Sequence, residues 1–479
     1  MEEKTRMVLP YEDHFHLKTL DLKKVLTLAL SRGGDFADIF LEYRISRSIL
    51  MEEDIIKETE ESITLGLGVR VIKKDRTGYA YTNDLSEEKI RIAALTAAAI
   101  ASLPGASPQQ IHLKQIKPGK EIAVVRSLAT TSPLQKKIDL VQKAYHSALN
   151  FNQTIKKVQV AYGESTQYVW IVNSQGLSIK DTRPMVKLVA QAIAEKNGRR
   201  ESGFYGGGGR VGLEFFFRKL TAEEIGREAA KEASLLLEAA EPPAGEYPVI
   251  LAPGHSGVLV HEAVGHLLEA DFIRKKTSIF WNKLGKKIGS EQITIYDDPT
   301  IPGFRGSYRV DDEGTQPTRT LLIEKGRVKG FLQDRLSARL MKKSLNGHGR
   351  RQDFTNWPVP RMSNTYIDRG EYSPEEIIRS VSQGFYVSRL SGGQVEDSGK
   401  FTFSVTLGFM IEDGQLTRPV KQATLIGTNL DILQKVEMLG SDLEFGLQTG
   451  TCSKEGQDVP VSDGCPTMKI SRMTIGGLR

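Results

Sequence analysis

Apolar and polar residues alternate along the N-terminal part of the chain. From about Asp35 to Val71 this alternation, together with many β-branched residues, predicts successive antiparallel strands. A helix should follow, because Ser86 supplies an N-cap before an acidic first turn and helix formers continue up to Pro104. The residues from Pro104 to Thr131 carry Pro, Gly and Ser and are typical of a linker.

The same combination of helix and sheet returns after the linker. A helix should begin at Ser132, and strands are predicted at "KVQVAY" and "QYVWIVN", the second followed by a turn at Asn173–Gly176. Alternate apolar residues in 186–194 share one face, which predicts another strand. "TAEE" at Thr221–Glu224 is a capping box that opens a helix running to about Ala240.

The stretch "EPPAGEYP" at Glu241–Pro248 interrupts these patterns and marks the main domain boundary. Beyond it, "LLIEKGRVKGF" and "FMIEDGQLTRP" each predict a hairpin, with turns at Lys325-Gly326 and Asp413-Gly414. The expected fold is α+β. It has an N-terminal α+β domain with linker (1–131), a central α+β domain (132–245), both with antiparallel sheets flanked by helices, and a mostly β C-terminal domain (246–479).

Composition excludes several classes of protein. The 479 residues are 39% hydrophobic with mixed charges, as in globular proteins, and the net charge of +6 is dispersed, which argues against a nucleic-acid-binding surface. The first twenty residues lack a secretion signal, and no apolar run approaches the length of a membrane span. We therefore expect a cytoplasmic protein without membrane contact. Two cysteines, Cys452 and Cys465, do not make a disulfide framework.

A glycine-rich segment, "GFYGGGGRVG" at Gly203–Gly212, lacks the Lys-Ser/Thr pair of a phosphate-binding loop. A flexible loop or a close backbone approach is the simpler interpretation.

Candidate chemistry is concentrated in one short stretch. Of the eight histidines, His255, His261 and His266 fall within twelve residues, and Glu262 follows His261 directly. Imidazoles and an adjacent carboxylate are what a hydrolytic zinc site uses, since the carboxylate can take a proton from water and pass it to the leaving amine. The structural alternative is a buried histidine pair on an apolar helix.

The spacing H-E-x-x-x-H constrains the geometry of such a site. Five residues along a regular α-helix leave two side chains about 140° apart, too far round the helix to bind one ion. A π-bulge absorbs one extra residue, and Gly265 before His266 makes a local distortion easier. If His261 and His266 share a metal, the helix must be distorted between them.

A catalytic zinc needs a third protein ligand. Glu269 and Asp271 lie near the motif, and Cys452 is a distant candidate. Glu269 is equally suited to orient an imidazole from behind. Spacing alone does not choose among them.

Several longer motifs, in order, make the chain as a whole resemble a known family. They are "DFADIFLE", "RTGYAYTNDL", "GVLVHEAVGHLLEADF", "LIEKGRVKGFLQDRLSARLM", "GHGRRQDFTNWPVPRMSNTYI", "LSGGQVEDSGKFTFSV", "RPVKQATLIG" and "CSKEGQDVPVSDGCPTMKI". With them the chain resembles the TldD/PmbA metallopeptidases, also called modulators of DNA gyrase, over nearly its full length. Within that family it is similar to the TldD-type subunit, which carries the metal motif.

The resemblance implies a zinc-dependent peptidase that hydrolyses unfolded or short peptides with metal-activated water. It places the metal ligands at His261, His266 and Cys452 and the general base at Glu262; ligand type and family favour zinc over iron. It also implies a heterodimer with a PmbA/TldE-type related subunit, or a homodimer. The alternative is a noncatalytic protein-binding regulator, related to gyrase or to toxin-antitoxin systems, which the presence of the full metal set disfavours.

Two further expectations concern the substrate. Arg351 or Tyr366, from their motif context, are candidates to stabilise the oxyanion. A peptide is expected to add as a β-strand to an exposed edge of the C-terminal sheet, which would favour unfolded chains.

Cys465 departs from the family pattern and is expected to be a buried apolar residue. His255 and His348 are not expected to be ligands.

Overall fold

The computed structural model describes residues 14–15, 17, 19–102, 113–123, 125–395, 399–446 and 450–476. Residues 104–112 and 124 of the expected linker lie outside the described residues. The longer helices are α2 (Thr19–Ala29), α3 (Glu87–Ala101), α4 (Leu134–Leu149) and α6 (Ala222–Glu238), and the shorter ones are α5 (Phe215–Arg218), α8 (Ala270–Lys275), α9 (Arg335–Met341), α10 (Pro374–Arg379) and α11 (Asn429–Gln434). A 3-10 turn, η1 (Ala129–Thr131), precedes α4. The rest of the ordered structure is mostly strand, so the α+β class is confirmed.

One large sheet dominates the N-terminal half. It contains β1 (Phe36–Glu52), β2 (Ile55–Lys73), β3 (Arg76–Thr82), β4 (Lys114–Ile116), β5 (Ile155–Asn173), β6 (Leu177–Lys196) and β7 (Arg199–Gly209). The order is β3-β2-β1-β5-β6, with β4 and β7 both paired to β6. Because β1 pairs with β5 along its length, the boundary expected at 131/132 falls within a segment that connects strands of one sheet.

The strands predicted at "KVQVAY" and "QYVWIVN" are parts of the single strand β5. The polar residues between them resemble a break in the sequence, but Glu164 and Thr166 are buried in the structure. Glu164 pairs with Lys137 of α4, and the Thr166 hydroxyl lies 2.9 Å from the Thr130 hydroxyl. Buried polar groups with partners do not interrupt a strand. The turn at Asn173–Gly176 is present, with Gly176 N–H donating to the Asn173 carbonyl.

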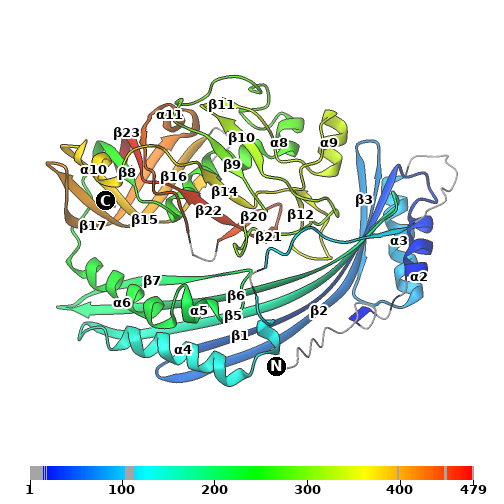
Figure 1. Ribbon diagram of the computed structural model, residues 1–479, viewed down its shortest axis with the longest axis horizontal. Coiled ribbons are helices and arrows are strands. Elements are labelled where there is room, and N and C mark those ends of the chain that lie inside the picture. The colour runs from blue at the N-terminus through cyan, green and yellow to red at the C-terminus, as the bar shows by residue number, and fades with distance from the viewer. Residues whose placement is uncertain are drawn as a thin grey trace.

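Two pairs of helices cover the sheet at its two ends (Figure 1). At one end, α2 and α3 bury their apolar faces against β1 and β2, and at the other α4 and α6 pack on β5 and β6. The capping box at Thr221 and Glu224 is confirmed: each side chain accepts a hydrogen bond from the other residue's backbone. The alternate apolar residues in 186–194 are fully buried under these helices. No helix among the described residues is long and apolar enough to cross a membrane.

The C-terminal half is mostly β and lies on the other side of the large sheet from α4 and α6 (Figure 1). One sheet contains β8 (Gly245–Leu251), β15 (Gln383–Val395), β16 (Lys400–Glu412), β17 (Gln415–Thr428), β18 (Val436–Leu439) and β23 (Met468–Gly476). Its strands run in the order β17-β16-β15-β8-β23-β18, and β17 also pairs with β23. That pairing closes five strands into a ring, which removes most of the edges expected to receive a peptide.

A second C-terminal sheet lies beside this ring. It contains β9 (Ile295–Asp297), β10 (Thr320–Glu324), β11 (Arg327–Val328), β14 (Asn364–Ile367), β19 (Glu444–Phe445) and β22 (Ser462–Cys465), in the order β11-β10-β9-β14-β22-β19. Two small hairpin-like pairs complete the half: β12 (Gly349–Arg350) with β13 (Val359–Pro360), and β20 (Thr451–Lys454) with β21 (Gln457–Pro460).

Both predicted C-terminal hairpins are confirmed. β10 pairs antiparallel with β11, and β16 with β17. In each two-residue turn both residues have positive φ: 45° and 73° at Lys325 and Gly326, and 51° and 73° at Asp413 and Gly414. This backbone matches the right-handed twist of the flanking strands and explains the glycine in each turn.

Most of the glycine-rich segment forms a strand, so the interpretation as a flexible loop is wrong. Residues 199–209 form strand β7, which pairs with β6 along its length. Its glycines allow other backbone to come close: a Cβ at Gly203 would lie 2.2 Å from the Ala229 carbonyl of α6, and one at Gly209 would lie 2.2 Å from the Gly303 carbonyl. The close-approach interpretation is therefore the correct one.

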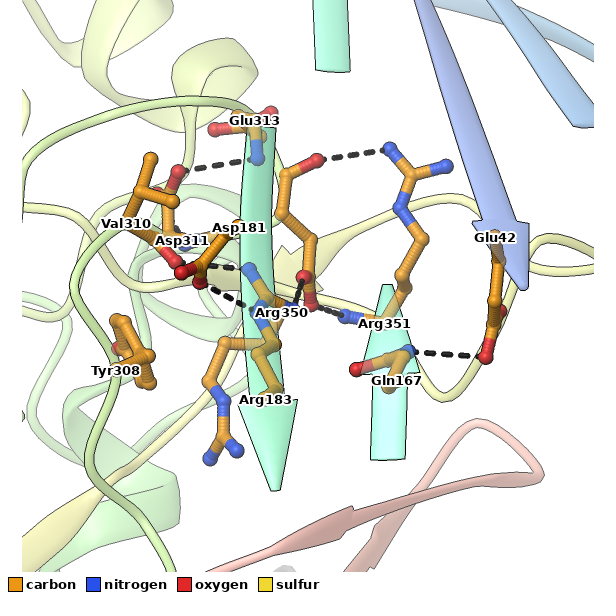
Figure 2. Close-up of polar contacts among 12 residues, drawn as sticks. Glu42, Gln167, Asp181, Arg183, Tyr308, Val310, Asp311, Glu313, Arg350 and Arg351 are labelled. Atoms are coloured by element: carbon orange, nitrogen blue, oxygen red, sulfur yellow. Dashed lines mark hydrogen bonds and ion pairs between the residues drawn. The ribbon is translucent and has the colours of Figure 1, made fainter. Parts of the chain in front are cut away.

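Buried and partly buried ion pairs join the large sheet to the C-terminal half. Arg70 of β2 contacts Glu313 at 2.7 Å, and the Nε of Arg309 donates to Asp181 of β6 at 2.8 Å. Figure 2 shows this junction, with Asp181 and Glu313 among the labelled residues. The second expected boundary, at 245/246, falls at the start of β8.

Candidate metal centre

The segment that carries the two histidines begins as helix α7 (Val258–Val260) and changes character at His261. His261–Gly265 (η3) is a π-helical turn, and a 3-10 turn, His266–Leu268 (η4), follows it. The distortion that the H-E-x-x-x-H spacing requires is therefore present. One extra residue is absorbed between the histidines, and their rings meet edge to face with centroids 5.1 Å apart.

Glycine is required at position 265 because there is no room for a side chain, and not because the backbone conformation is unusual. Its φ and ψ are −57° and −55°, values that any residue adopts. A Cβ at this position would lie 1.9 Å from the sulfur of Met362, which is fully buried. The glycine thus lets the π-helical turn pack directly on the Met362 side chain.

Replacing Gly265 with alanine should lower the free energy of unfolding by about 1–3 kcal/mol, because the added methyl group overpacks the core against Met362. Chemical denaturation measures this loss. In a Met362→Ala background the same substitution should cost much less, since the space is then open. An equal cost in both backgrounds would show that the Met362 contact is not the reason for the glycine.

The third member of the cluster comes from a distant hairpin. Cys452 on β20 places its Sγ 3.4 Å from Nε2 of His266, although 186 residues separate the two in sequence. The ligand atoms of His261, His266 and Cys452 all lie within 4.8 Å of one another. His261 and Cys452 are 2% and 3% exposed, so both are almost wholly shielded from solvent.

A buried carboxylate supports each imidazole from behind. Nδ1 of His261 lies 2.8 Å from Asp463 Oδ1 on β22, and Nδ1 of His266 lies 3.2 Å from Glu269 Oε2. When Nδ1–H donates to a carboxylate, Nε2 is left as the ligand atom and the ring orientation is fixed. In both rings Nδ1 thus faces a carboxylate, which leaves Nε2 as the nitrogen that binds a metal once it has lost its proton.

The negative charge of the supporting carboxylate Glu269 is balanced by a nearby lysine. Lys454, two residues after Cys452 on the same hairpin, contacts Glu269 at 2.9 Å and Asp271 at 2.8 Å. Burial raises the pKa of Glu269, but Lys454 and then His266 outweigh burial and lower that pKa to about 2. Glu269 thus stays a carboxylate in the protein interior.

The electrostatics of the three candidate ligands favour a thiolate. Burial raises the pKa of Cys452, but the positive charges of the protonated His261 and His266 rings, and their hydrogen bonds to the sulfur, outweigh burial and bring that pKa well below its usual value. The thiolate is the form of cysteine that binds metal ions. Two imidazoles and one thiolate are a donor set that suits zinc, and the 3.4 Å separation of Sγ and Nε2 is close to the roughly 3.6 Å that tetrahedral zinc imposes.

Glu262 lies at the accessible side of this cluster. Its Oε2 is 3.9 Å from His266 Nε2, the atom that faces Cys452, and its side chain is 28% exposed. A carboxylate in this position reaches solvent and the ligand atoms at once, as a proton acceptor for water requires.

The other sequence candidates have different surroundings. Asp271 contacts Lys454, and Cys465 is buried with its thiol directed at the Ala252 carbonyl, 3.6 Å away. The Arg351 guanidinium is occupied by the Asp312 and Asn356 carbonyls and by the Tyr79 hydroxyl.

Tyr366 stacks on Tyr296 with ring centroids 5.7 Å apart. Among the described residues, neither Arg351 nor Tyr366 forms a hydrogen bond, ion pair or ring contact with His261, His266 or Cys452.

Asp463 and Lys454 are the site residues that sequence reasoning missed. Both lie in the motif "CSKEGQDVPVSDGC" that also contains Cys452, so their nearness to a predicted ligand was visible in the sequence. A charged residue near a predicted ligand on a strand is identified as a partner of another ligand only when the element that faces the strand is known.

Three family models match consecutive parts of the chain. Residues 37–101 match the model of PmbA/TldA metallopeptidase domain 1, residues 129–237 the central domain, and residues 244–477 the C-terminal domain. Two solved structures share the fold. They are a putative modulator of DNA gyrase from Thermotoga maritima (TM-score 0.78, 23% identity, 95% of this chain and 99% of that one) and TldE from Thermococcus kodakarensis (TM-score 0.77, 22% identity, 95% and 100%).

Sequence relatives extend over almost the whole chain. A metalloprotease TldD homolog of Haemophilus influenzae is 38% identical over 470 residues, covering 96% of this chain and 97% of its own length. A zinc metalloprotease TldD homolog of Saccharolobus solfataricus is 27% identical over 465 residues, 95% of this chain and 99% of that one. The chain therefore belongs to the TldD/PmbA family of metallopeptidases.

Proposed function

We propose that the protein is a zinc peptidase in which His261, His266 and Cys452 hold the metal and Glu262 is the general base. The observation that carries the proposal is the convergence of two carboxylate-oriented imidazoles and a buried thiolate within 4.8 Å of one another. A bound zinc ion supplies Lewis acidity, which lowers the pKa of water and polarises a carbonyl group.

The chain's own residues perform the proton transfers. Glu262 takes a proton from the attacking water as the water oxygen bonds to the peptide carbonyl carbon. The same carboxylic acid then gives that proton to the nitrogen of the breaking C–N bond, so Glu262 ends as it began. Asp463 and Glu269 keep the two imidazoles in place throughout.

The burial of the site supports unfolded or short peptides as substrates. His261 and Cys452 are almost inaccessible, and His266 is 19% exposed at its side chain. A folded protein surface does not bring a peptide bond to groups as buried as these, whereas an extended chain is able to do so. Pairing with a related PmbA/TldE-type subunit, or with a second copy, is part of the proposal.

Metal removal tests the proposed function. A chelator should abolish cleavage of a short unfolded peptide, and added zinc should restore it. Metal analysis should find about one zinc ion per untreated chain, as a single three-ligand site predicts. Undiminished cleavage by chain shown to be free of metal would contradict a metallopeptidase. Absence of cleavage both with and without metal would favour the noncatalytic alternative.

A further inference from the structure

A cavity of about 410 Å³ lies where the large sheet meets the C-terminal half. Ser165 of β5 and Arg183 of β6 line one side, and Thr451, Val459 and Pro460 of the β20–β21 hairpin line another. Val459 pairs directly across that hairpin with Cys452, the candidate thiolate ligand. The cavity and the candidate metal centre therefore share one wall.

Arginines dominate the lining of the cavity. Six are present, and three of them have carboxylate partners: Arg44 with Glu42, Arg183 with Asp181 and Asp312, and Arg351 with Asp38. Figure 2 shows Arg183, Arg350 and Arg351 gathered between strands of the sheet and loops of the C-terminal half. The other three arginines, Arg210, Arg305 and Arg350, form what we call the unpaired arginine cluster.

No carboxylate of the described residues pairs with this cluster. Arg305 donates through Nε to the Gly450 carbonyl at 3.1 Å. Arg350 donates to the Met362 and Pro460 carbonyls and lies over the Tyr308 ring. Arg210 is 7% exposed, and its Nε has no hydrogen-bond partner.

The cavity's own carboxylates are occupied elsewhere. Three carboxylates line the cavity: Asp312 pairs with Arg183, the two oxygens of Asp311 accept the backbone N–H groups of Glu313, Thr315 and Gly349, and Asp458 accepts the Ser453 hydroxyl. None of the three forms an ion pair with the unpaired arginine cluster, and for Arg210 burial and the neighbouring Arg183 and Arg350 outweigh the attraction of Asp181 and Asp312.

Burial makes that charge unfavourable without removing it. Burial, and then Arg183 and Arg350, lower the pKa of Arg210 to about 9, while burial and Arg350 lower the pKa of Arg305 to about 10. Both guanidinium groups therefore stay protonated at neutral pH. Buried charges in proteins are normally paired, and a planar guanidinium fits a carboxylate with two parallel hydrogen bonds.

We propose that the unpaired arginine cluster binds the C-terminal carboxylate of the peptide substrate. The proposal rests on the proposed function and names its substrate class: short peptides with a free C-terminus, positioned by that end. Two observations favour a peptide over a free anion such as phosphate. The cavity is large enough for an organic group, and its wall is the hairpin that carries Cys452, so a chain anchored here extends along the candidate metal centre.

Binding, rather than cleavage, tests this proposal, so a failure of the peptidase assignment does not affect the result. Two fluorescent peptides of one sequence, one ending in a carboxylate and one in an amide, are titrated into the full-length Glu262→Gln chain. The carboxylate peptide should bind at least about tenfold more tightly, the ratio expected of charge-assisted hydrogen bonds. Adding Arg210→Gln should erase that preference and leave binding of the amide peptide unchanged.

Two controls separate recognition from folding. Arg472→Gln removes an arginine that is exposed and paired with Glu246 outside the cavity, so it should preserve the preference. Arg210→Gln should melt at the same temperature as its parent or higher, because it removes a desolvated charge that has no partner. A lower melting temperature with an unchanged preference would mark Arg210 as merely structural and overturn the proposal.

Inorganic phosphate is the third ligand tested, after the carboxylate peptide and the amide peptide. Phosphate that displaces the carboxylate peptide but not the amide peptide supports a site that reads the terminal carboxylate. Equal binding of the two peptides would reject the proposal. If phosphate then still raised the melting temperature of the parent chain, and Arg210→Gln removed that effect, the cavity would be a site for a free anion instead.

Discussion

Replacing Glu262 with glutamine should leave the metal in place and reduce peptide hydrolysis by about 10²- to 10⁴-fold, the contribution typical of a general acid–base group. Glutamine keeps the size of the side chain but accepts no proton from water. The carboxylate is not among the three clustered ligand atoms, and its 3.9 Å distance to His266 Nε2 is longer than a hydrogen bond. Cleavage kinetics and metal analysis on one preparation measure both outcomes.

Glu269→Gln is the matched control, because it changes a second glutamate of the same segment. Glu269 supports His266 through Nδ1, so its loss should weaken metal affinity by about 10- to 100-fold, and excess zinc should recover activity. The Glu262→Gln chain should not recover with zinc. Cleavage retained by Glu262→Gln would remove this residue as the base.

Replacing Cys452 with alanine should empty the chain of metal after dialysis. The substitution removes one of three direct ligands, so the loss of affinity should exceed the about 10- to 100-fold that follows loss of a supporting carboxylate. Atomic absorption on dialysed protein measures the metal, and a thermal melt shows whether the fold persists.

Cys465→Ala provides the comparison for this cysteine. Cys465 is fully buried, and burial, followed by Asp442 and Asp463, raises the pKa of its thiol, which disfavours the metal-binding form. Its replacement should leave metal content unchanged. Full metal in Cys452→Ala would instead assign the third ligand to Glu269, the alternative that the sequence left open.

The sequence predicted the local features of the site well. The five-residue spacing of the histidines required a distorted helix, and the chain has a π-helical turn at that place. The reason for Gly265 was only partly predicted. Flexibility was expected, whereas the structure shows the need for space against Met362, and a contact between residues 97 positions apart leaves no local sequence signal.

Long-range features were harder to predict for the same physical reason. Cys452 was indicated by resemblance and not by spacing. Asp463 was missed because it lies on a strand far from His261 in sequence, and no regular spacing links a strand residue to an imidazole on a distant helical turn. The continuity of β5 was missed because Glu164 and Thr166 resemble a loop until Lys137 and Thr130 are placed beside them.

The distance along the chain between the candidate ligands has a consequence during protein synthesis. His266 is made 186 residues before Cys452, and Asp463 follows later still. At typical elongation rates a nascent chain carries both histidines for roughly 10 to 40 seconds before the thiolate is made. On the proposed function, the peptidase thus stays incomplete until Cys452 and Asp463 have been made, and before that point it is not able to cut its own emerging, still unfolded segments.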